Sequence, residues 1–321
     1  VDVGVLGLAL AVQACWLALP CALGDRFAVF AFEVGGWRAH GLAGQLASWA
    51  VVAGAAAFLP SLLAGFQFPL LIGLLGRGRA EVGRQLGYAY AANTAGALLG
   101  SLLGGFLLIP ALSAPGCWWL AAGLTGLLAL WALVLAHRHA DRRLLGCGAG
   151  LLAVLVGMVV GCRGPTAFWR HSPIGYGWLE ELPRSPVALE DFIRDRRRRT
   201  HRQVDGREAS VGLLAGNSYS LFSNSKSDGA AQGDAPTQVM LGLVGAALHP
   251  RPRSACVVGL GTGTSAGWLA DVPGMERVDV VEIEPAIRDL AGDAFAPVNR
   301  DVLRKPNVRI VLGDAREMLL V

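Results

Sequence analysis

Residues 255–285 read ACVVGLGTGTSAGWLADVPGMERVDVVEIEP, and this stretch decides the fold of the C-terminal part of the chain. The apolar run 255–258 predicts a buried parallel strand. Three glycines follow it: Gly259, Gly261 and Gly263. A second apolar run, 278–283, predicts another strand and carries Glu282 near its end. The order strand, glycine turn, helix, strand, acid is typical of an α/β domain that binds a nucleoside.

The residue types in this stretch have a physical reason. Glycines let the backbone turn sharply and come close to a ligand, and the helix that follows begins with free N–H groups pointing there. An acid about twenty residues further on is placed to accept hydrogen bonds from ribose hydroxyls. The sequence therefore predicts a nucleoside-cofactor site at the ends of these strands.

A third predicted strand helps to distinguish which nucleoside cofactor the site would bind. Gly261, Gly263 and Ala266 also satisfy a variant of the dinucleotide pattern, so the glycines alone leave NAD open. The run 308–312 predicts a strand that leads into Asp314, a residue suited to the exocyclic amine of an adenine lying across three strand ends. The series favours an S-adenosylmethionine-type fold over NAD. The alternative without a ligand is an α/β domain with ordinary glycine turns.

Composition bounds the class of protein. The chain has 321 residues, which is enough for two domains, and it is 53% hydrophobic and 16% charged. A chain with this composition is too apolar to be an ordinary soluble protein. The basic residues are nearly all arginines that cluster at the ends of apolar segments and in one run, so nucleic-acid binding is not expected. The cysteines show no metal-ligand spacing, and no metal is expected.

Apolar segments of roughly bilayer length fill the first half of the chain. There are five of them: 3–23, 42–75, 86–109, 118–136 and 144–160. They predict a multi-pass protein of the cell membrane. The basic loops at 77–84 and 137–143 both predict the cytoplasmic side, and a fifth span would then put the soluble part outside. Because the cofactor is cytosolic and an arginine-rich run follows the last segment, we expect the soluble part in the cytoplasm, with 144–160 packed or re-entrant.

Small residues on the third apolar segment suggest a packing surface. They recur every four residues: Gly96, Gly100 and Gly104. Such a stripe predicts close packing against another helix. Asn93 lies on the same segment and is expected to make either an interhelical contact or a substrate contact.

The composition predicts a domain organisation in three parts. They are a transmembrane helical domain of about five spans at 1–162, a basic linker at 163–206 and an α/β domain at 207–321. Within the linker, Arg196 to Arg199 predict a helix that faces solvent or lipid headgroups. The runs 209–213 and 219–223 predict a β hairpin, and 239–248 predicts a helix.

Several motifs occur in series along the second half. They are NSKSDG (224–229), GDAPTQVMLG (233–242), HPRPRSACVVGLGTG (249–263), VDVVEIEP (278–285) and NVRIVLGDAREML (307–319). The series resembles the spermidine synthase (polyamine aminopropyltransferase) family, and more closely its membrane-fused members. The membrane part resembles theirs in LPSLLAG (59–65) and GYAYAANTAG (87–96).

The resemblance implies an activity. An aminopropyl group would move from decarboxylated S-adenosylmethionine to a polyamine such as putrescine. The implied fold is a multi-span α-helical membrane domain followed by an α/β Rossmann-like (class I S-adenosylmethionine-type) domain. The partners expected are a small polyamine substrate, the lipid bilayer and a second copy of the chain in a homodimer.

The resemblance also implies roles for individual residues. Gly259, Gly261 and Gly263 would line the cofactor, Glu282 would hold its ribose and Asp314 its adenine. Asp234 matches the acid that faces the amino end of the cofactor, and Gln238 matches a glutamine of the same stretch. Two departures bear on amine binding: Thr237 stands where soluble members have a tyrosine, and Ser225 replaces a glycine usual in fused members.

Two other functions remain open at this level. One is an S-adenosylmethionine-dependent methyltransferase that uses the same site. The other is a transporter-like membrane protein with a nucleoside-binding regulatory domain.

The catalytic base is not assigned to a residue of this chain. In the resembling family it is an aspartate at the end of the fourth strand, and only seven residues follow Asp314. We therefore expect the aspartate to lie beyond Val321, with the sheet cut after its third strand and the chain cut at both ends. On this hypothesis a longer parent protein is the enzyme, and the 321-residue chain binds the cofactor without turnover.

Overall fold

The computed structural model describes residues 2–75, 82–162, 164–171 and 181–320. The chain divides into two units, Val1–Trp169 and Arg170–Val321. Each unit is described by itself.

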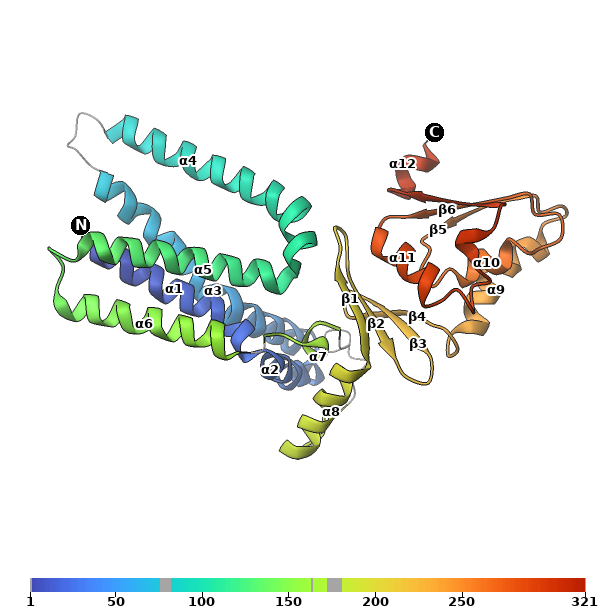
Figure 1. Cartoon of the computed structure of the whole chain (residues 1–321), viewed down its shortest axis with the longest axis horizontal. Helices are drawn as coiled ribbons and strands as arrows, with labels where there is room; N and C mark the ends of the chain where they lie inside the picture. The colour runs from blue at the N-terminus through green and yellow to red at the C-terminus, as the bar shows by residue number, and fades with distance from the viewer. Residues whose placement is uncertain (1, 76–81, 163, 172–180, 321) are drawn as a thin grey trace. The chain divides into compact units, whose positions relative to one another are not determined.

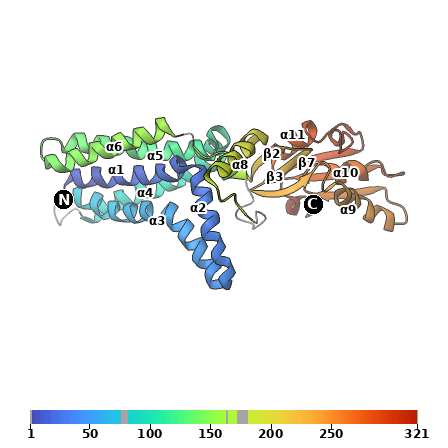
Figure 2. The same cartoon turned by 90° about the horizontal axis from the view of Figure 1, so that it is seen from below.

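The first unit is helical (Figure 1). Its helices are α1 (Val3–Leu23), α2 (Asp25–Gly35), α3 (Gly41–Leu75), α4 (Val82–Leu103), α5 (Ile109–Ala136) and α6 (Arg142–Gly161), with short turns η1 (Gly36–His40) and η3 (Gly104–Leu108) between them. Helix α1 packs against α3, α5 and α6. Figure 2 shows α2 and the first part of α3 as a helical hairpin that projects from the other helices.

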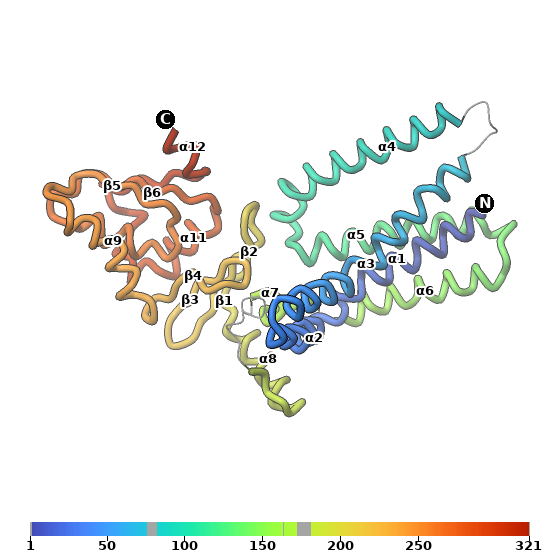
Figure 3. Tube along the Cα trace, turned by 180° about the vertical axis from the view of Figure 1, so that it is seen from behind, coloured from blue at the N-terminus to red at the C-terminus, as the bar shows by residue number. Residues whose placement is uncertain are grey.

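Four helical stretches are long and apolar enough to cross a membrane, by length and composition: Val3–Leu23, Asp25–Leu75, Val82–Ala136 and Arg142–Gly161. The third of them is bent. Ser113 has a non-helical backbone (φ 64°, ψ 166°) inside α5, and the chain turns back between α4 and the rest of α5 (Figure 3). Pro115 lies beside the bend and cannot supply a helical N–H. The five predicted segments thus correspond to α1, α3, α4, α5 and α6.

The glycine stripe packs against no helix in the described part of the chain. A Cβ atom added at Gly96, Gly100 or Gly104 would meet no described atom within 4 Å. Asn93 on the same helix is exposed and makes no side-chain hydrogen bond within the described part of the chain. The stripe is on α4, whose residues are mostly exposed, and within the described part of the chain no helix covers the stripe or Asn93.

Close helix packing occurs instead between α1, α5 and α6. A Cβ at Gly7 would lie 2.9 Å from Leu133 Cγ, and one at Gly148 would lie 2.6 Å from Leu133 Cδ1. One at Gly126 would lie 2.5 Å from Leu155 Cδ2. These glycines let leucine side chains fill the space between the helix axes.

The second unit contains two sheets. Short helix α7 (Ala167–His171) crosses the boundary between the units. The elements that follow are α8 (Pro186–Arg199), β1 (Thr200–Asp205), β2 (Ser210–Ala215), β3 (Tyr219–Ser223), β4 (Lys226–Ala230), α9 (Ala235–Leu248), β5 (Ser254–Val258), α10 (Thr264–Leu269), β6 (Arg277–Glu282), α11 (Pro285–Asp293), η5 (Val302–Arg304), β7 (Val308–Leu312) and α12 (Ala315–Leu319). Strands β1 to β4 form an antiparallel meander, and β5, β6 and β7 form a parallel sheet in that order.

The structure adds strands to the predicted linker and hairpin. The predicted hairpin is present as β2 and β3 in the middle of a four-stranded sheet, and the predicted linker over 163–206 contains the arginine helix, as the end of α8, and strand β1. Strand β1 was missed because it is polar: of its residues only Asp205 is buried. A strand at the edge of a sheet with only one buried side chain lacks the alternation of apolar and polar residues by which strands are predicted.

The turn between β3 and β4 explains one departure from the family pattern. Asn224 and Ser225 both have positive φ, at 47° and 69°, as a two-residue hairpin loop of type I′ requires. Ser225 occupies a position that glycine would adopt with less strain. Its hydroxyl donates a 2.7 Å hydrogen bond to the carbonyl of Arg170, a bond that glycine cannot make.

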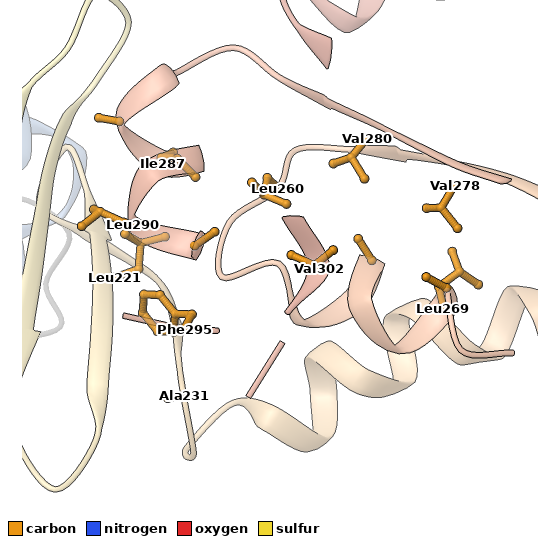
Figure 4. Packing of buried hydrophobic residues seen from close by; sticks show 14 of the residues in the cluster. Leu221, Ala231, Leu260, Leu269, Val278, Val280, Ile287, Leu290, Phe295 and Val302 are labelled. Carbon is orange, nitrogen blue, oxygen red and sulfur yellow. The ribbon is translucent and has the colours of Figure 1, made fainter. Parts of the chain in front are cut away.

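One hydrophobic core joins the meander to the parallel sheet (Figure 4). Leu221 of β3 packs in the same cluster as Leu290 and Phe295, which belong to α11 and the loop after it. Val278 and Val280 on β6 are also fully buried there. This shared core holds the meander against α11 and so places β4 near the strand ends.

A buried histidine lies under the meander. His171 is 1% exposed, and a Cβ at Gly212 of β2 would lie 2.7 Å from its Nδ1. Neither ring nitrogen has a hydrogen-bond partner in the described part of the chain. Burial, aided by the positive charge of Arg170 and opposed by Asp205, lowers the pKa of His171 to about 4.

This histidine predicts a loss of stability in acid. Its pKa in the folded state lies below the ordinary 6.5, so stability is full above pH 6.5 and falls as the pH drops towards 4. We expect the second unit to lose roughly 2–3 kcal/mol between about pH 7 and pH 4.5. Hydrogen exchange of the β2 amides would measure it, with His171→Leu as the control that flattens the slope. If the stability of His171→Leu fell with decreasing pH as steeply as that of the parent chain, groups other than His171 would cause the loss.

Candidate functional site

The carboxyl end of the parallel sheet gathers the predicted site residues. Val258 at the end of β5 lies opposite Val281, and Glu282 at the end of β6 lies opposite Leu312 of β7. Because parallel strands end on the same edge, the glycine turn after β5, Glu282 and Asp314 come together there.

The three predicted glycines adopt left-handed conformations. The φ angles of Gly259, Gly261 and Gly263 are 84°, 54° and 80°. A Cβ at Gly259 or Gly261 would meet no described atom within 4 Å, whereas one at Gly263 would lie 2.8 Å from Val302 Cγ1. The first two glycines therefore face open space beside the turn, and the third lets the turn close against the core.

Glu282 is held by the turn it faces. It is 4% exposed; its Oε2 accepts a 2.8 Å hydrogen bond from the N–H of Leu260, and its Oε1 accepts one of 2.8 Å from the N–H of Glu284. Each carboxylate oxygen keeps a further lone pair. Two oxygens fixed side by side can accept hydrogen bonds from two vicinal hydroxyls.

Glu284 has a different task from Glu282. Its Oε1 caps α11 by accepting from the N–H of Ala286 at 3.1 Å. Its Oε2 accepts from the N–H groups of Glu208 and Ala209 at 3.0 and 3.2 Å, in the turn between β1 and β2. Glu284 therefore ties the meander to the parallel sheet.

Asp314 caps α12 and is engaged by an arginine. It accepts from the N–H of Arg316 at 2.9 Å, and the Nε of Arg316 lies 3.0 Å from its Oδ2. Hydrogen bonding to Arg316 holds the pKa of Asp314 below its usual range. The carboxylate is thus ionised, and an exocyclic amine would share it with Arg316.

Gln238 connects three elements around the turn. The hydroxyl of Thr262, in the glycine turn, donates to Gln238 Oε1. Gln238 Nε2 donates a long bond of 3.4 Å to the carbonyl of Ala230, at the end of β4. A Cβ at Gly229 would lie 2.7 Å from that nitrogen, so β4 passes close to it. Gln238 positions the glycine turn.

Replacing Gln238 with alanine should loosen that turn and weaken an adenosyl ligand. Losing about 1–2 kcal/mol of hydrogen bonding predicts a Kd about 5- to 30-fold higher. Calorimetry on the two proteins would measure it. Gln232→Ala removes an exposed amide six residues away and serves as the matched control. Equal effects of the two substitutions would contradict this role.

Two further acids lie near the site on β4 and α9. Asp234 precedes α9, is exposed, and its side chain makes no capping hydrogen bond. Burial raises the pKa of Asp228 on β4, the negative charge of Glu282 adds to the shift, and Lys226 opposes it. A Cβ at Gly229, the residue after Asp228, would lie 3.1 Å from Thr262 Cγ2, so β4 passes beside the glycine turn.

Asn299 was missed by the sequence analysis. It is fully buried, and its Nδ2 donates 2.8 Å hydrogen bonds to the carbonyls of Thr262 and Ala291. It therefore fixes the glycine turn at Thr262, the residue that Gln238 also contacts. A single asparagine 37 residues from its partner leaves no local pattern.

Comparisons with known proteins identify homologues. A polyamine aminopropyltransferase of Mycobacterium tuberculosis is 29% identical over 274 residues, covering 80% of this chain and 46% of the relative. One of Corynebacterium efficiens is 26% identical over 271 residues, covering 80% and 47%. No protein-family model matches the chain. The chain is thus similar in sequence to these two polyamine aminopropyltransferases.

The similarity covers only part of these relatives. The chain spans about half the length of the curated relatives it matches. Arg170–Val321 is too short to hold 274 aligned residues, so the similarity extends into the helical unit. A spermidine synthase structure from Thermotoga maritima overlays 38% of this chain and 42% of that chain at 15% identity, with a TM-score of 0.36.

Proposed function

We propose that this chain supplies the adenosyl-binding part of a membrane-anchored aminopropyltransferase. The substrates would be decarboxylated S-adenosylmethionine and a polyamine such as putrescine. The observation that carries the proposal is Glu282, whose two oxygens are fixed by the glycine turn and β6 and keep lone pairs for a ribose diol. The homology to aminopropyltransferases supports it.

Each site residue has a role in this proposal. Gly259 and Gly261 leave room for the sulfonium end of the ligand beside the turn, while Glu282 accepts hydrogen bonds from the ribose. Asp314 accepts from the adenine amine. Gln238 holds the turn in place.

The acids on β4 and α9 act on the reacting amines. In the reaction, the amine nitrogen forms a bond to the carbon beside the sulfonium, the carbon–sulfur bond breaks, and sulfur keeps the electron pair as a neutral thioether. The nitrogen then loses a proton. Asp228 and Asp234 attract the cationic amine groups and repel a carboxylate, so they favour the decarboxylated donor.

Calorimetry with three ligands tests the proposal. We expect decarboxylated S-adenosylmethionine to bind more tightly than S-adenosylmethionine, and NAD to show no binding. Preference for S-adenosylmethionine would point to a methyltransferase. Binding of NAD alone would refute the adenosyl-sulfonium site. Vesicle uptake assays address a transporter-like protein with a regulatory domain.

Asp234→Asn should narrow the preference between the two sulfonium ligands. Removing one negative charge near the amino end weakens the decarboxylated ligand and relieves repulsion of the carboxylate. We expect the ratio of the two Kd values to fall about 5- to 10-fold. Asp289→Asn changes the same charge on α11 and is the control. An unchanged ratio in Asp234→Asn would remove this residue from the site.

We also propose that the apolar helices span the membrane and that the second unit lies in the cytoplasm. The four candidate stretches support the first statement, and the cytosolic donor supports the second. The chain should stay in the membrane pellet after carbonate washing, and recovery in the soluble fraction would refute the anchor. A reporter fused after Arg202 would establish the side.

A further inference from the structure

A groove runs along the helical unit between α5 and α6. Both helices pack against α1, and a short loop joins them, so they run antiparallel (Figure 1). Gly126 lets the two helices meet, because a Cβ there would lie 2.5 Å from Leu155 Cδ2. Both residues line a groove with a volume of about 730 Å³, which is within the size range of small-molecule sites.

The groove is apolar along its whole length. The residues that line it fall within 119–130 and 152–160, and all are leucine, valine, alanine, glycine or tryptophan. Leu124, Leu127 and Val156 on its walls are more than half exposed. A Cβ at Gly123 would meet no described atom within 4 Å, so this glycine leaves the space inside the groove open.

The length of the groove matches one leaflet of a bilayer. From Trp119 to Leu130 the helix rises about 16 Å. The hydrocarbon core of a bilayer is about 30 Å thick, so each leaflet is about 15 Å deep. A single acyl chain therefore fits the groove in length as well as in polarity.

A hydrogen-bond donor lies at one end of the groove. Trp119 is near the end of α6, since a Cβ at Gly164, which follows that helix, would lie 3.8 Å from its Nε1. The neighbouring Trp118 donates its indole N–H to the carbonyl of Leu17. The indole N–H of Trp119 has no acceptor in the described part of the chain. Tryptophans at the ends of membrane helices lie at the level of lipid headgroups and ester groups.

We propose that this groove binds one acyl chain of a membrane phospholipid, with the indole N–H of Trp119 donating to the ester carbonyl. The inference rests on the membrane anchoring proposed above, which brings the groove to a bilayer. The walls favour a lipid chain over a further helix. Helices that pack in membranes meet through small residues, whereas the exposed walls here are leucine and valine, and a helix would need a surface as long as the full bilayer.

Native mass spectrometry of the full chain in detergent, titrated with phosphatidylcholine, tests the site. We expect one tightly retained lipid. Gly123→Leu fills the groove without a clash and should weaken retention about 10-fold or more. Trp119→Phe keeps a ring but removes the N–H donor, and should weaken retention about 2- to 10-fold.

Gly157→Leu is the matched control. It adds the same side chain on α6 outside the groove, where a Cβ also meets no described atom within 4 Å, and should retain lipid like the parent chain. Equal loss in Gly157→Leu, unchanged retention in Gly123→Leu or no lipid on the parent chain would each overturn the proposal. A dimer that Gly123→Leu dissociates would overturn it too, because a helix of a second copy would then fill the groove.

Three further measurements on Gly123→Leu separate the possible causes of a failure. Its melting temperature, followed by circular dichroism, should match that of the parent chain and so exclude unfolding. Carbonate extraction and adenosyl-ligand calorimetry should also match. Failure of the lipid site is thereby distinguished from failure of the membrane anchor or of the proposed function.

Discussion

Replacing Glu282 with alanine is expected to weaken an adenosyl ligand about 10- to 150-fold. The substitution removes the acceptor for the ribose hydroxyls, and a hydrogen bond to a charged group contributes about 1.5–3 kcal/mol. It also leaves the N–H groups of Leu260 and Glu284 without an acceptor, so the glycine turn loses its fixed position. Calorimetry at a temperature where both proteins are folded would measure the change.

Glu282→Gln separates the two effects. The amide keeps the size of the side chain and one acceptor oxygen, but its NH₂ would face an N–H donor. We expect weaker binding than in the parent chain, with a smaller loss of stability than in Glu282→Ala. Parent-like affinity in both variants would remove Glu282 from the ligand site.

Replacing Glu284 with alanine is expected to lower stability and leave the intrinsic ligand affinity nearly unchanged. Three backbone N–H groups lose their acceptor, those of Ala286, Glu208 and Ala209. Loss of a helix cap together with unsatisfied N–H groups predicts a cost of roughly 2–5 kcal/mol for the second unit. Chemical denaturation followed by the circular dichroism of both units, or exchange of the β1 and β2 amides, would show it.

A second glutamate-to-alanine substitution in the same unit controls for the loss of one negative charge. Glu276→Ala removes an exposed acid whose pair with Arg253 spans 3.4 Å with both side chains about two-thirds exposed. It should change stability by less than about 1 kcal/mol. If Glu284→Ala were as mild as this control, the tie between the meander and the parallel sheet would be unimportant. If it abolished ligand binding in protein shown to be folded, the roles of the two glutamates would be reversed.

The apolar segments and the parallel sheet could be predicted from the sequence because their signals are local. Buried parallel strands are continuous apolar runs, and 308–312 was predicted with the bounds that β7 has. The glycines after β5 were recognisable because left-handed φ angles favour glycine. The bilayer-length helices need only a long apolar run.

Tertiary structure decided the features that depend on a distant partner. Strand alternation points Glu282 and Glu284 in similar directions. Only their contacts distinguish them: Glu282 binds the glycine turn, and Glu284 binds the turn after β1. The spacing of Gly96, Gly100 and Gly104 is equally consistent with packed and exposed helices, and the structure leaves it exposed.

The sequence by itself determined the local elements of this protein: apolar helices, a strand–glycine turn–strand unit and an acid at the second strand end. Only the tertiary structure added β1 and β4 to the meander, and only it brought Asn299 and Gln238 together at Thr262 of the glycine turn. The physical reason is that a hydrogen bond or a buried contact between residues far apart in the chain depends on their positions in space. A periodic pattern records only which face of one element is buried.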